Sequence, residues 1–114
     1  MKIVFINAVG TRVEKEFETI EQASGEIGPK WPVICDGKAG HFEMSSAGCK
    51  FVETSAMLRF FAYDEHLPER RRHILKHFHD LAEIVVLTVP FSRERTKALG
   101  RLLESKGAAE RAAL

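Results

Sequence analysis

The first part of the chain alternates between short apolar runs and turn residues, a pattern that indicates β-strands. Ile, Val and Phe dominate residues 2–8, and residues 11–18 alternate between apolar and charged side chains. Gly10 separates the two runs, so together they predict a strand hairpin. Thr19 and Gln22, three residues apart, form a capping-box pattern, which predicts a short helix directly after the threonine.

Residues 31–54 predict a β-meander. Asp36-Gly37 stands between two apolar segments and is a strong signal for a two-residue hairpin turn. A Ser-Ser-Ala-Gly turn at 45–48 then separates two further strand-like runs. In each of these runs the apolar side chains at alternate positions would share one face of the sheet.

Beyond residue 54 the apolar positions recur with helical spacing. One helix is predicted around residues 57–63 and a second over residues 68–83, where Pro68 suits the first helical position. A third helix is predicted over residues 92–106, with a serine as its cap and Gly107 as its end. These segments place the helices in the second half of the chain.

The run Ile84-Val-Val-Leu-Thr-Val89 has two interpretations. Its β-branched residues and the following Pro90 predict a strand, which we take as the first interpretation. Apolar positions from Ile74 to Val89 also keep helical spacing, so a helix is the alternative. As a strand, this run would put the basic helices on one face of the sheet. As a helix, it would create a long C-terminal helical hairpin.

Together these segments predict a single α+β domain over residues 1–114. We expect an antiparallel sheet of four to six strands, mostly N-terminal, packed against two or three helices. Residues 1–54 are the strand-rich part and residues 55–107 the helix-rich part, whereas the alanine-rich tail 108–114 is expected to fray. A chain of 114 residues can bury such a core without a metal or a disulfide.

Charge and cysteine content narrow the class of protein. There are 17 Lys and Arg residues against 16 Asp and Glu residues, which argues against a surface devoted entirely to nucleic acid. Two cysteines do not make a disulfide scaffold, and the N-terminal run lacks the layout of a signal peptide. No apolar run approaches the roughly 20 residues that a bilayer requires. We therefore expect a cytoplasmic protein with reduced thiols and no membrane contact.

Cationic and titratable side chains crowd into residues 67–80 of the predicted second helix. At about 100° per residue, Ile74 and Phe78 belong to its apolar stripe. Arg71 lies seven residues before Phe78 and so shares that stripe, where an unpaired charge is costly. This guanidinium must reach solvent, form an ion pair or bind a ligand. If it binds a partner, Arg71→Met should leave folding intact and weaken that binding.

A metal site is a second interpretation of the same helix. His73 and His77 stand four residues apart, a spacing that lets two imidazoles reach one metal ion from adjacent turns, and Asp80 lies on the same flank. However, Lys76 discourages a cation, and the metalloprotease motif H-E-x-x-H is absent. These three residues are therefore weak metal candidates, and we expect no metal and no other cofactor.

The cysteines and glycines give no stronger catalytic signal. Cys35, His41 and Cys49 have a spacing that matches no common zinc framework, and no oxyanion-hole pattern accompanies either thiol. Gly37 and Gly40 lack the remainder of a phosphate-binding P-loop motif. A hairpin turn and small buried side chains explain these residues more simply.

The function that the sequence favours is a small non-catalytic binding or regulatory protein, with an inhibitor as one example. A protein is the expected partner, because arginines are favoured at protein interfaces and bind carboxylates well. The residues expected to bind it are the basic and histidine side chains of the two long helices: Arg70, Arg71, Arg72, His73, Lys76, His77, Arg93 and Arg95.

Two other functions and one assembly remain as alternatives. The first is a nucleic-acid-binding transcriptional regulator that uses the basic helices 68–83 and 92–106 side by side. The second is a metal- or thiol-dependent enzyme. A homo-oligomer is also expected if the apolar side chains of the first helix exceed what one small core needs; these are Met57, Phe60, Phe61 and Tyr63.

Overall fold

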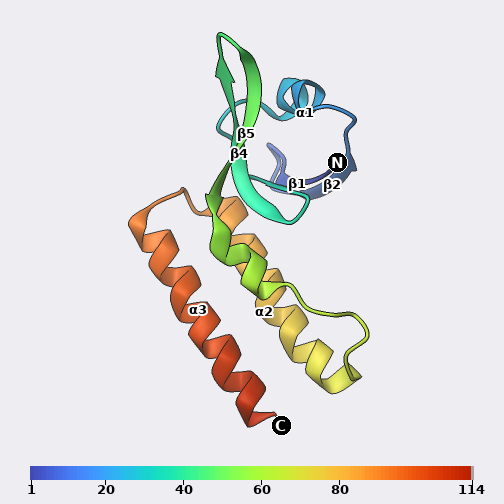
Figure 1. Ribbon diagram of the computed structural model, residues 1–114, viewed down its shortest axis with the longest axis vertical. Coiled ribbons are helices and arrows are strands. Elements are labelled where there is room, and N and C mark those ends of the chain that lie inside the picture. The colour runs from blue at the N-terminus through green and yellow to red at the C-terminus, as the bar shows by residue number, and fades with distance from the viewer. Residues whose placement is uncertain (114) are drawn as a thin grey trace.

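The alternation of apolar runs and turns builds a five-stranded antiparallel sheet, and the helices follow it. The computed structural model describes residues 1–113 and confirms the α+β fold (Figure 1). The strand order is β2-β1-β3-β4-β5, and every neighbouring pair is antiparallel. The elements are β1 (Lys2–Ile6), β2 (Arg12–Glu16), α1 (Ile20–Ile27), β3 (Val33–Cys35), β4 (Lys38–Ser45), β5 (Gly48–Ser55), the 3-10 helix η1 (Ala56–Phe61), α2 (Glu69–Thr88) and α3 (Arg93–Ala112).

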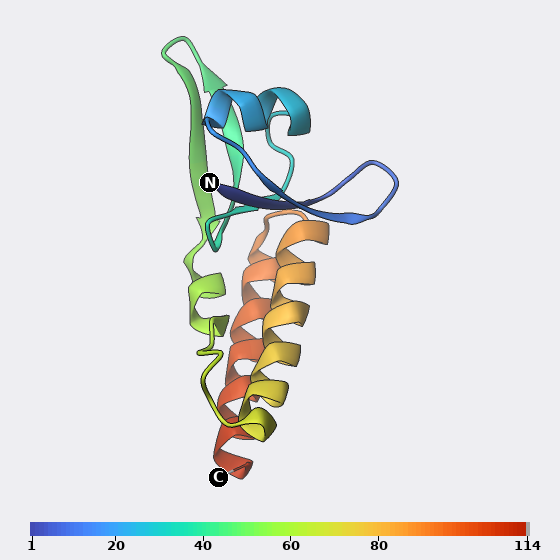
Figure 2. The same ribbon diagram turned by 90° about the vertical axis from the view of Figure 1, so that its right-hand side faces the viewer.

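Helices α2 and α3 form an antiparallel hairpin that projects from the sheet (Figures 1 and 2). The molecule is therefore elongated, with extents of 51 × 30 × 27 Å. The end of α2 and the start of α3 lie at the sheet, whereas the start of α2 and the end of α3 lie far from it. We call this far end, residues 62–76 and 106–112, the hairpin tip. Across residues 1–113, no helix combines the length and apolar character needed to span a bilayer.

The sheet separates two apolar cores because its side chains alternate between its faces. One face packs against η1 and the α2–α3 hairpin, and its core consists of Val4, Ile34, Ala39, Leu58, Phe61, Ala82, Val86, Leu87 and Leu99. The opposite face packs under α1, and its core consists of Ile3, Phe5, Phe17, Ala23, Val33, Cys35 and Phe42. We refer to them as the hairpin-side core and the α1-side core.

Two local predictions are confirmed by their geometry. Asp36 and Gly37 both have positive φ, 49° and 83°, as a type I′ turn between β3 and β4 requires. Helix α1 begins after Thr19, whose hydroxyl accepts a hydrogen bond of 3.1 Å from the backbone N–H of Gln22. The Gln22 side chain in turn accepts one of 3.1 Å from the backbone N–H of Glu18, the residue before the cap, so the second bond of the predicted box is displaced by one residue.

A β-bulge interrupts the pairing of β4 with β5. Ala39 pairs with Ser55, but the next residue, Gly40, pairs with Glu53. Thr54 is therefore the additional residue on β5, and such a residue leaves the regular alternation of the strand. Gly40 is necessary here, because a Cβ atom at this position would lie only 2.1 Å from the carbonyl oxygen of Val52.

Residues 84–89 are not a strand, so the first interpretation is wrong and the helical alternative holds. Helix α2 continues to Thr88. Within this run Val86 and Leu87 are buried in the hairpin-side core, so tertiary packing outweighs the preference of β-branched residues for strands. Pro90 follows shortly after the helix end, as expected for a residue that disfavours helix before it.

The prediction that the last helix ends at Gly107 is also wrong. Helix α3 continues through this glycine to Ala112. The alanines at 108–112 favour helix strongly, and Lys106 forms an i,i+4 ion pair of 3.1 Å with Glu110. The expected frayed tail is therefore helical over most of its length, and Leu114 lies outside the described residues.

Candidate functional site

The hairpin tip holds most of the predicted binding residues. The chain leaves η1 at Phe61, crosses a loop over residues 62–68 and enters α2. Asp64 shapes this loop: its side chain accepts a hydrogen bond of 2.8 Å from the backbone N–H of His66, and its carbonyl accepts one of 3.2 Å from Leu67. Such side-chain-to-backbone bonds fix the conformation of a turn. The backbone of residues 64–67 is therefore held in one conformation next to the start of α2.

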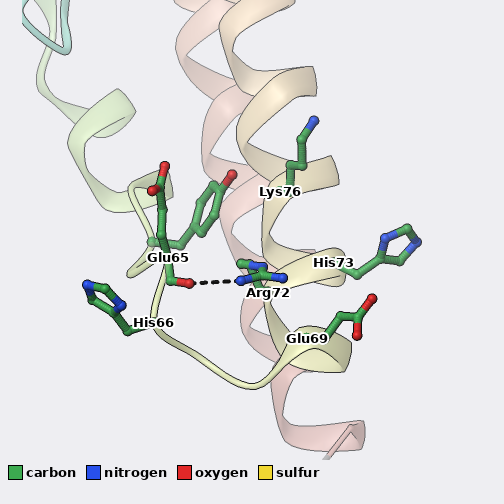
Figure 3. A pocket seen from close by; sticks show the side chains of 7 residues that line it. Glu65, His66, Glu69, Arg72, His73 and Lys76 are labelled. Atoms are coloured by element: carbon green, nitrogen blue, oxygen red, sulfur yellow. Dashed lines mark hydrogen bonds between the residues drawn. The ribbon is translucent and has the colours of Figure 1, made fainter.

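A cavity of about 490 Å³ lies between this loop and the start of α2 (Figure 3). In Figure 3, Glu65 and His66 come from the loop side, and Arg72, His73 and Lys76 come from the helix. The cavity therefore combines both signs of charge with aromatic surface. Its lining residues are Tyr63, Glu65, His66, Glu69, Arg72, His73 and Lys76.

Two arginines at the tip, Arg70 and Arg72, form no ion pair with a described carboxylate. The Arg72 guanidinium donates a hydrogen bond of 2.9 Å to the backbone carbonyl of Glu65, a neutral group (Figure 3). Arg70 is exposed and forms no ion pair within residues 1–113. Arg72 is thus oriented by the loop while it remains able to pair with an external anion.

Lys76 differs from these arginines, because its charge is compensated. Its ammonium group lies 2.6 Å from the Asp80 carboxylate, one turn further along α2, and this hydrogen bond raises the pKa of Lys76. Burial acts to raise the pKa of Asp80, but hydrogen bonds from Lys76 and His79 outweigh it and hold that pKa below its ordinary value. Lys76 is therefore already paired with a carboxylate, unlike Arg70 and Arg72.

The candidate metal ligands on α2 do not converge. The rings of His73 and His77 lie 4.5 Å apart at a tilt of 53°. Asp80 instead bonds to Lys76 and to Nδ1 of His79, at 3.2 Å. In the part of the chain that the structure describes, no three His, Cys, Asp or Glu side chains form a group able to hold a metal ion.

Arg71 has a structural partner. Its guanidinium lies 3.6 Å from the carboxylate of Glu110 on α3, and the side chain is 44% exposed. Glu110 also pairs with Lys106, so the three side chains connect the two helices at the tip. The position of Arg71 beside the apolar stripe is explained by this contact across the hairpin, so among the three consecutive arginines of α2 only Arg70 and Arg72 have no carboxylate partner within residues 1–113.

Arg71→Met is expected to change the free energy of unfolding by less than about 1 kcal/mol, because the ion pair with Glu110 is half-exposed. Glu110 keeps Lys106 as a partner in this variant. Urea denaturation followed by circular dichroism measures the change. A loss well above 1 kcal/mol would show that the contact between α2 and α3 at the tip depends on Arg71.

Arg93 and Arg95 lie at the opposite end of the hairpin from the tip, so the two groups of predicted binding residues are separated. Helices α2 and α3 do lie side by side, but they run in opposite directions (Figure 2). Each has 20 residues, a length of about 30 Å. The basic start of α2 therefore faces the end of α3, which carries Lys106 and Arg111, and it lies far from Arg93 and Arg95.

Arg95 is buried, so the prediction that it lies on the surface and contacts a partner did not anticipate its position. Only 3% of it is exposed, and it lies at the junction between the sheet and the hairpin. The sequence contains a signal for this position: Arg95 precedes the fully buried Leu99 by four residues, so the two share one face of α3.

Glu83 is a second buried charged residue, and it accepts a hydrogen bond from Arg12 of β2.

The two cysteines are free and lie in different surroundings. Cys35 is buried in the α1-side core, and burial raises the pKa of its thiol, which opposes formation of the reactive thiolate. Cys49 is half-buried on β5. The His41 ring lies 3.0 Å from the Glu43 carboxylate, so its described polar partner is an acid and not a thiol.

The apolar residues of the first predicted helix mostly serve the protein's own core. Phe61 is completely buried and Met57 packs against the hairpin-side core. Tyr63 lines the tip cavity, and its ring contacts the edge of His79 at 5.7 Å. Phe60 alone of these four is largely exposed, at 61%. The excess of apolar surface that would indicate a second subunit is therefore confined to one side chain of this segment.

No protein-family model, curated protein or solved structure matches the chain. Two sites in the described part of the chain contain arginines that lack compensation by an ion pair. One is at the hairpin tip, where Arg70 and Arg72 have no carboxylate partner within residues 1–113. The other is at the junction between sheet and hairpin, where Arg95 is buried.

Proposed function

We propose that the protein is a small non-catalytic binding protein of the cytoplasm that holds another protein through its hairpin tip. A single observation carries this proposal. Arg72 lines a cavity of about 490 Å³, Arg70 lies two residues before it, and neither arginine forms an ion pair with a carboxylate within residues 1–113. The two free cysteines fit a reducing compartment.

The chemistry of the tip favours a partner surface that carries carboxylates next to apolar groups. A guanidinium binds a carboxylate with two parallel hydrogen bonds, and such pairs are among the stronger polar contacts. The hydrogen bond to Glu65 already orients Arg72, so less side-chain entropy is lost when a partner binds. Tyr63 in the same cavity supplies aromatic surface, which is enriched at protein interfaces. Binding at this projecting end would suit an inhibitor or a regulator that covers part of its target.

A protein fits this surface better than a nucleic acid does. Glu65 and Glu69 line the same cavity as Arg72. A protein surface can offer N–H donors to these two carboxylates together with a carboxylate for Arg72, whereas a phosphate backbone offers only anions. The basic residues of α3 run along its whole length and alternate with Glu94, Glu104 and Glu110. A phosphate backbone would therefore meet carboxylates as well as cations along the hairpin.

Site-directed photo-crosslinking tests the proposal. We would place a photoreactive phenylalanine analogue at His66 of the tip and, as a matched control, at the exposed Lys50 of β5. Irradiation in extracts of the source cells is expected to give a discrete protein adduct from position 66 and none from position 50. Arg70→Glu with Arg72→Glu should reduce that adduct at least about tenfold, because hydrogen bonds to charged groups contribute roughly 1.5–3 kcal/mol each.

The control for charge is Arg93→Glu with Lys97→Glu, which reverses two charges near the start of α3. This variant should crosslink like the unmodified protein. Equal adducts from positions 66 and 50, or an adduct that the tip variant leaves unchanged, would contradict the proposal. Titration with DNA and RNA at low salt completes the test, since tight binding that falls steeply with salt would replace the protein partner with a nucleic acid.

A further inference from the structure

A second cavity lies where the sheet meets the helical hairpin. Its volume is about 310 Å³, within the range of small-molecule sites. Segments from three parts of the fold surround it: the loop before β3, strands β4 and β5, and the link between α2 and α3. Its lining includes three basic residues and no Asp or Glu, and consists of Lys30, Pro32, Gly40, His41, Thr54, Thr88, Pro90, Phe91 and Arg95.

Arg95 is the central group of this cavity. It is 3% exposed and forms no ion pair with a described carboxylate. Its Nη1 donates long hydrogen bonds to the carbonyls of Val86 and Val89, at 3.3 and 3.4 Å, and its Nη2 donates to Thr54 at 3.0 Å. The buried Nε has no partner within residues 1–113. A buried charge in this state is costly unless a counter-charge joins it.

The groups that Arg95 does contact compensate only part of its charge. Val86 and Val89 belong to the C-terminal end of α2, where the helix dipole is equivalent to about half a negative charge. The Phe91 ring lies 5.1 Å from the guanidinium carbon and adds a cation–π contact. Burial lowers the pKa of Arg95, which is the direction expected where compensation is incomplete. An arginine nevertheless keeps its proton, so positive charge remains at the cavity wall.

The fold also fixes the walls opposite Arg95. The backbone N–H of Lys30 donates to the carbonyl of Phe42 at 2.8 Å, which holds the loop against β4. The β-bulge takes Thr54 out of the regular strand pairing and places its hydroxyl against the guanidinium. Gly40 belongs to the same bulge and supplies a wall without a side chain. Rigid elements of both halves of the molecule therefore shape the cavity.

From this arrangement we infer that the junction cavity binds a small metabolite through an oxyanion group, either a carboxylate or a phosphate, with Arg95 and Lys30 as its cationic contacts. The ligand would connect the sheet to the hairpin, since Lys30 lies on the sheet side and Arg95 on α3. Its hydroxyl contact would be Thr54. The inference is independent of the proposed function, because the tip lies at the other end of the hairpin.

The single tryptophan provides a direct readout. Trp31 stands between Lys30 and Pro32, two residues of the cavity wall, and is 43% exposed. We would titrate the protein with inorganic phosphate and with succinate at constant ionic strength, using chloride as the reference, and record Trp31 fluorescence and the melting temperature. Saturable binding of phosphate or succinate, accompanied by a rise in melting temperature, is expected. Comparison of the two titrations assigns the oxyanion class.

Variants connect that binding to the cavity. Arg95→Met should weaken binding by more than about tenfold, since hydrogen bonds to a charged group are lost. Lys30→Gln should weaken it about threefold or more, whereas Lys50→Gln, an exposed lysine of β5 outside the cavity, should leave it unchanged. If Arg95→Met does not fold, the same titrations are made with Lys30→Gln and Thr54→Val, which should both weaken binding.

Two outcomes would overturn the inference. One is the absence of saturable binding of either anion to the unmodified protein up to about 10 mM, above the affinity range of specific sites. The other is binding that Lys30→Gln and Lys50→Gln weaken equally, which would indicate general attraction of anions to the surface. Neither outcome would alter the crosslinking expected at the hairpin tip.

Discussion

Gly40→Ala should destabilise the protein by about 3 kcal/mol or more, the upper part of the range for overpacked interiors. The added Cβ would lie 2.1 Å from the carbonyl oxygen of Val52, and 2.7 and 2.8 Å from two ring atoms of Phe51. A backbone oxygen cannot move aside as a flexible side chain can. Relief therefore requires that β5 separate from β4 at the bulge. Urea denaturation followed by circular dichroism and Trp31 fluorescence measures the loss.

Gly100→Ala is the matched control. Gly100 lies inside α3, and a Cβ there would have no contact within 4 Å. Alanine favours helix over glycine by about 1 kcal/mol, so this variant is expected to gain stability. The two glycine-to-alanine changes are therefore expected to shift the free energy of unfolding in opposite directions. A Gly40→Ala variant as stable as the unmodified protein would show that β5 does not approach this glycine closely.

Phe61→Ala is the second large effect, with an expected loss of about 3–5 kcal/mol. Phe61 is completely buried in the hairpin-side core, where residues of the sheet, α2 and α3 meet. Loss of its ring leaves a cavity at the contact that holds the hairpin to the sheet. The midpoint and slope of a urea transition give the change, and a two-step transition would show the hairpin unfolding separately.

The neighbouring Phe60 is the control for Phe61→Ala. It is the same residue type in the same 3-10 helix, but it is 61% exposed. Phe60→Ala is expected to cost less than about 1 kcal/mol. Similar losses at both positions would mean that the assignment of buried and exposed faces to η1 is incorrect. Increased solubility of the Phe60 variant would be consistent with its exposed position.

Local sequence signals predicted the strands, turns and short helix of the N-terminal half well, because each turn or cap there depends on only a few neighbouring residues. The Asp36-Gly37 turn needs only two residues with positive φ, and the cap at Thr19 needs only one hydroxyl and one N–H. The errors concern the C-terminal half. Residues 84–89 have strand-like composition, but the hairpin-side core buries Val86 and Leu87, and this long-range packing decides for helix.

The candidate sites show the same division between local and long-range information. Periodicity correctly placed Arg71 beside the apolar stripe of α2, but its partner Glu110 lies 39 positions further along the chain, and only the tertiary fold brings them together. Arg95 was grouped with surface arginines by composition alone. Its spacing from Leu99 predicts the buried face, yet the contacts with Thr54 and the end of α2 depend on how α3 meets the sheet.

The order of elements along the chain also matters during synthesis. Strands β1 to β5 all leave the ribosome before α2 and α3, so one face of the sheet has no cover when it first forms. That face includes Val4, Ile34 and Ala39. It stays exposed to solvent until α2 and α3, which end near residue 112, have been synthesised. At about 5–20 residues per second the interval lasts several seconds. Charged side chains on the edge strand β2 discourage pairing with other nascent chains in that time.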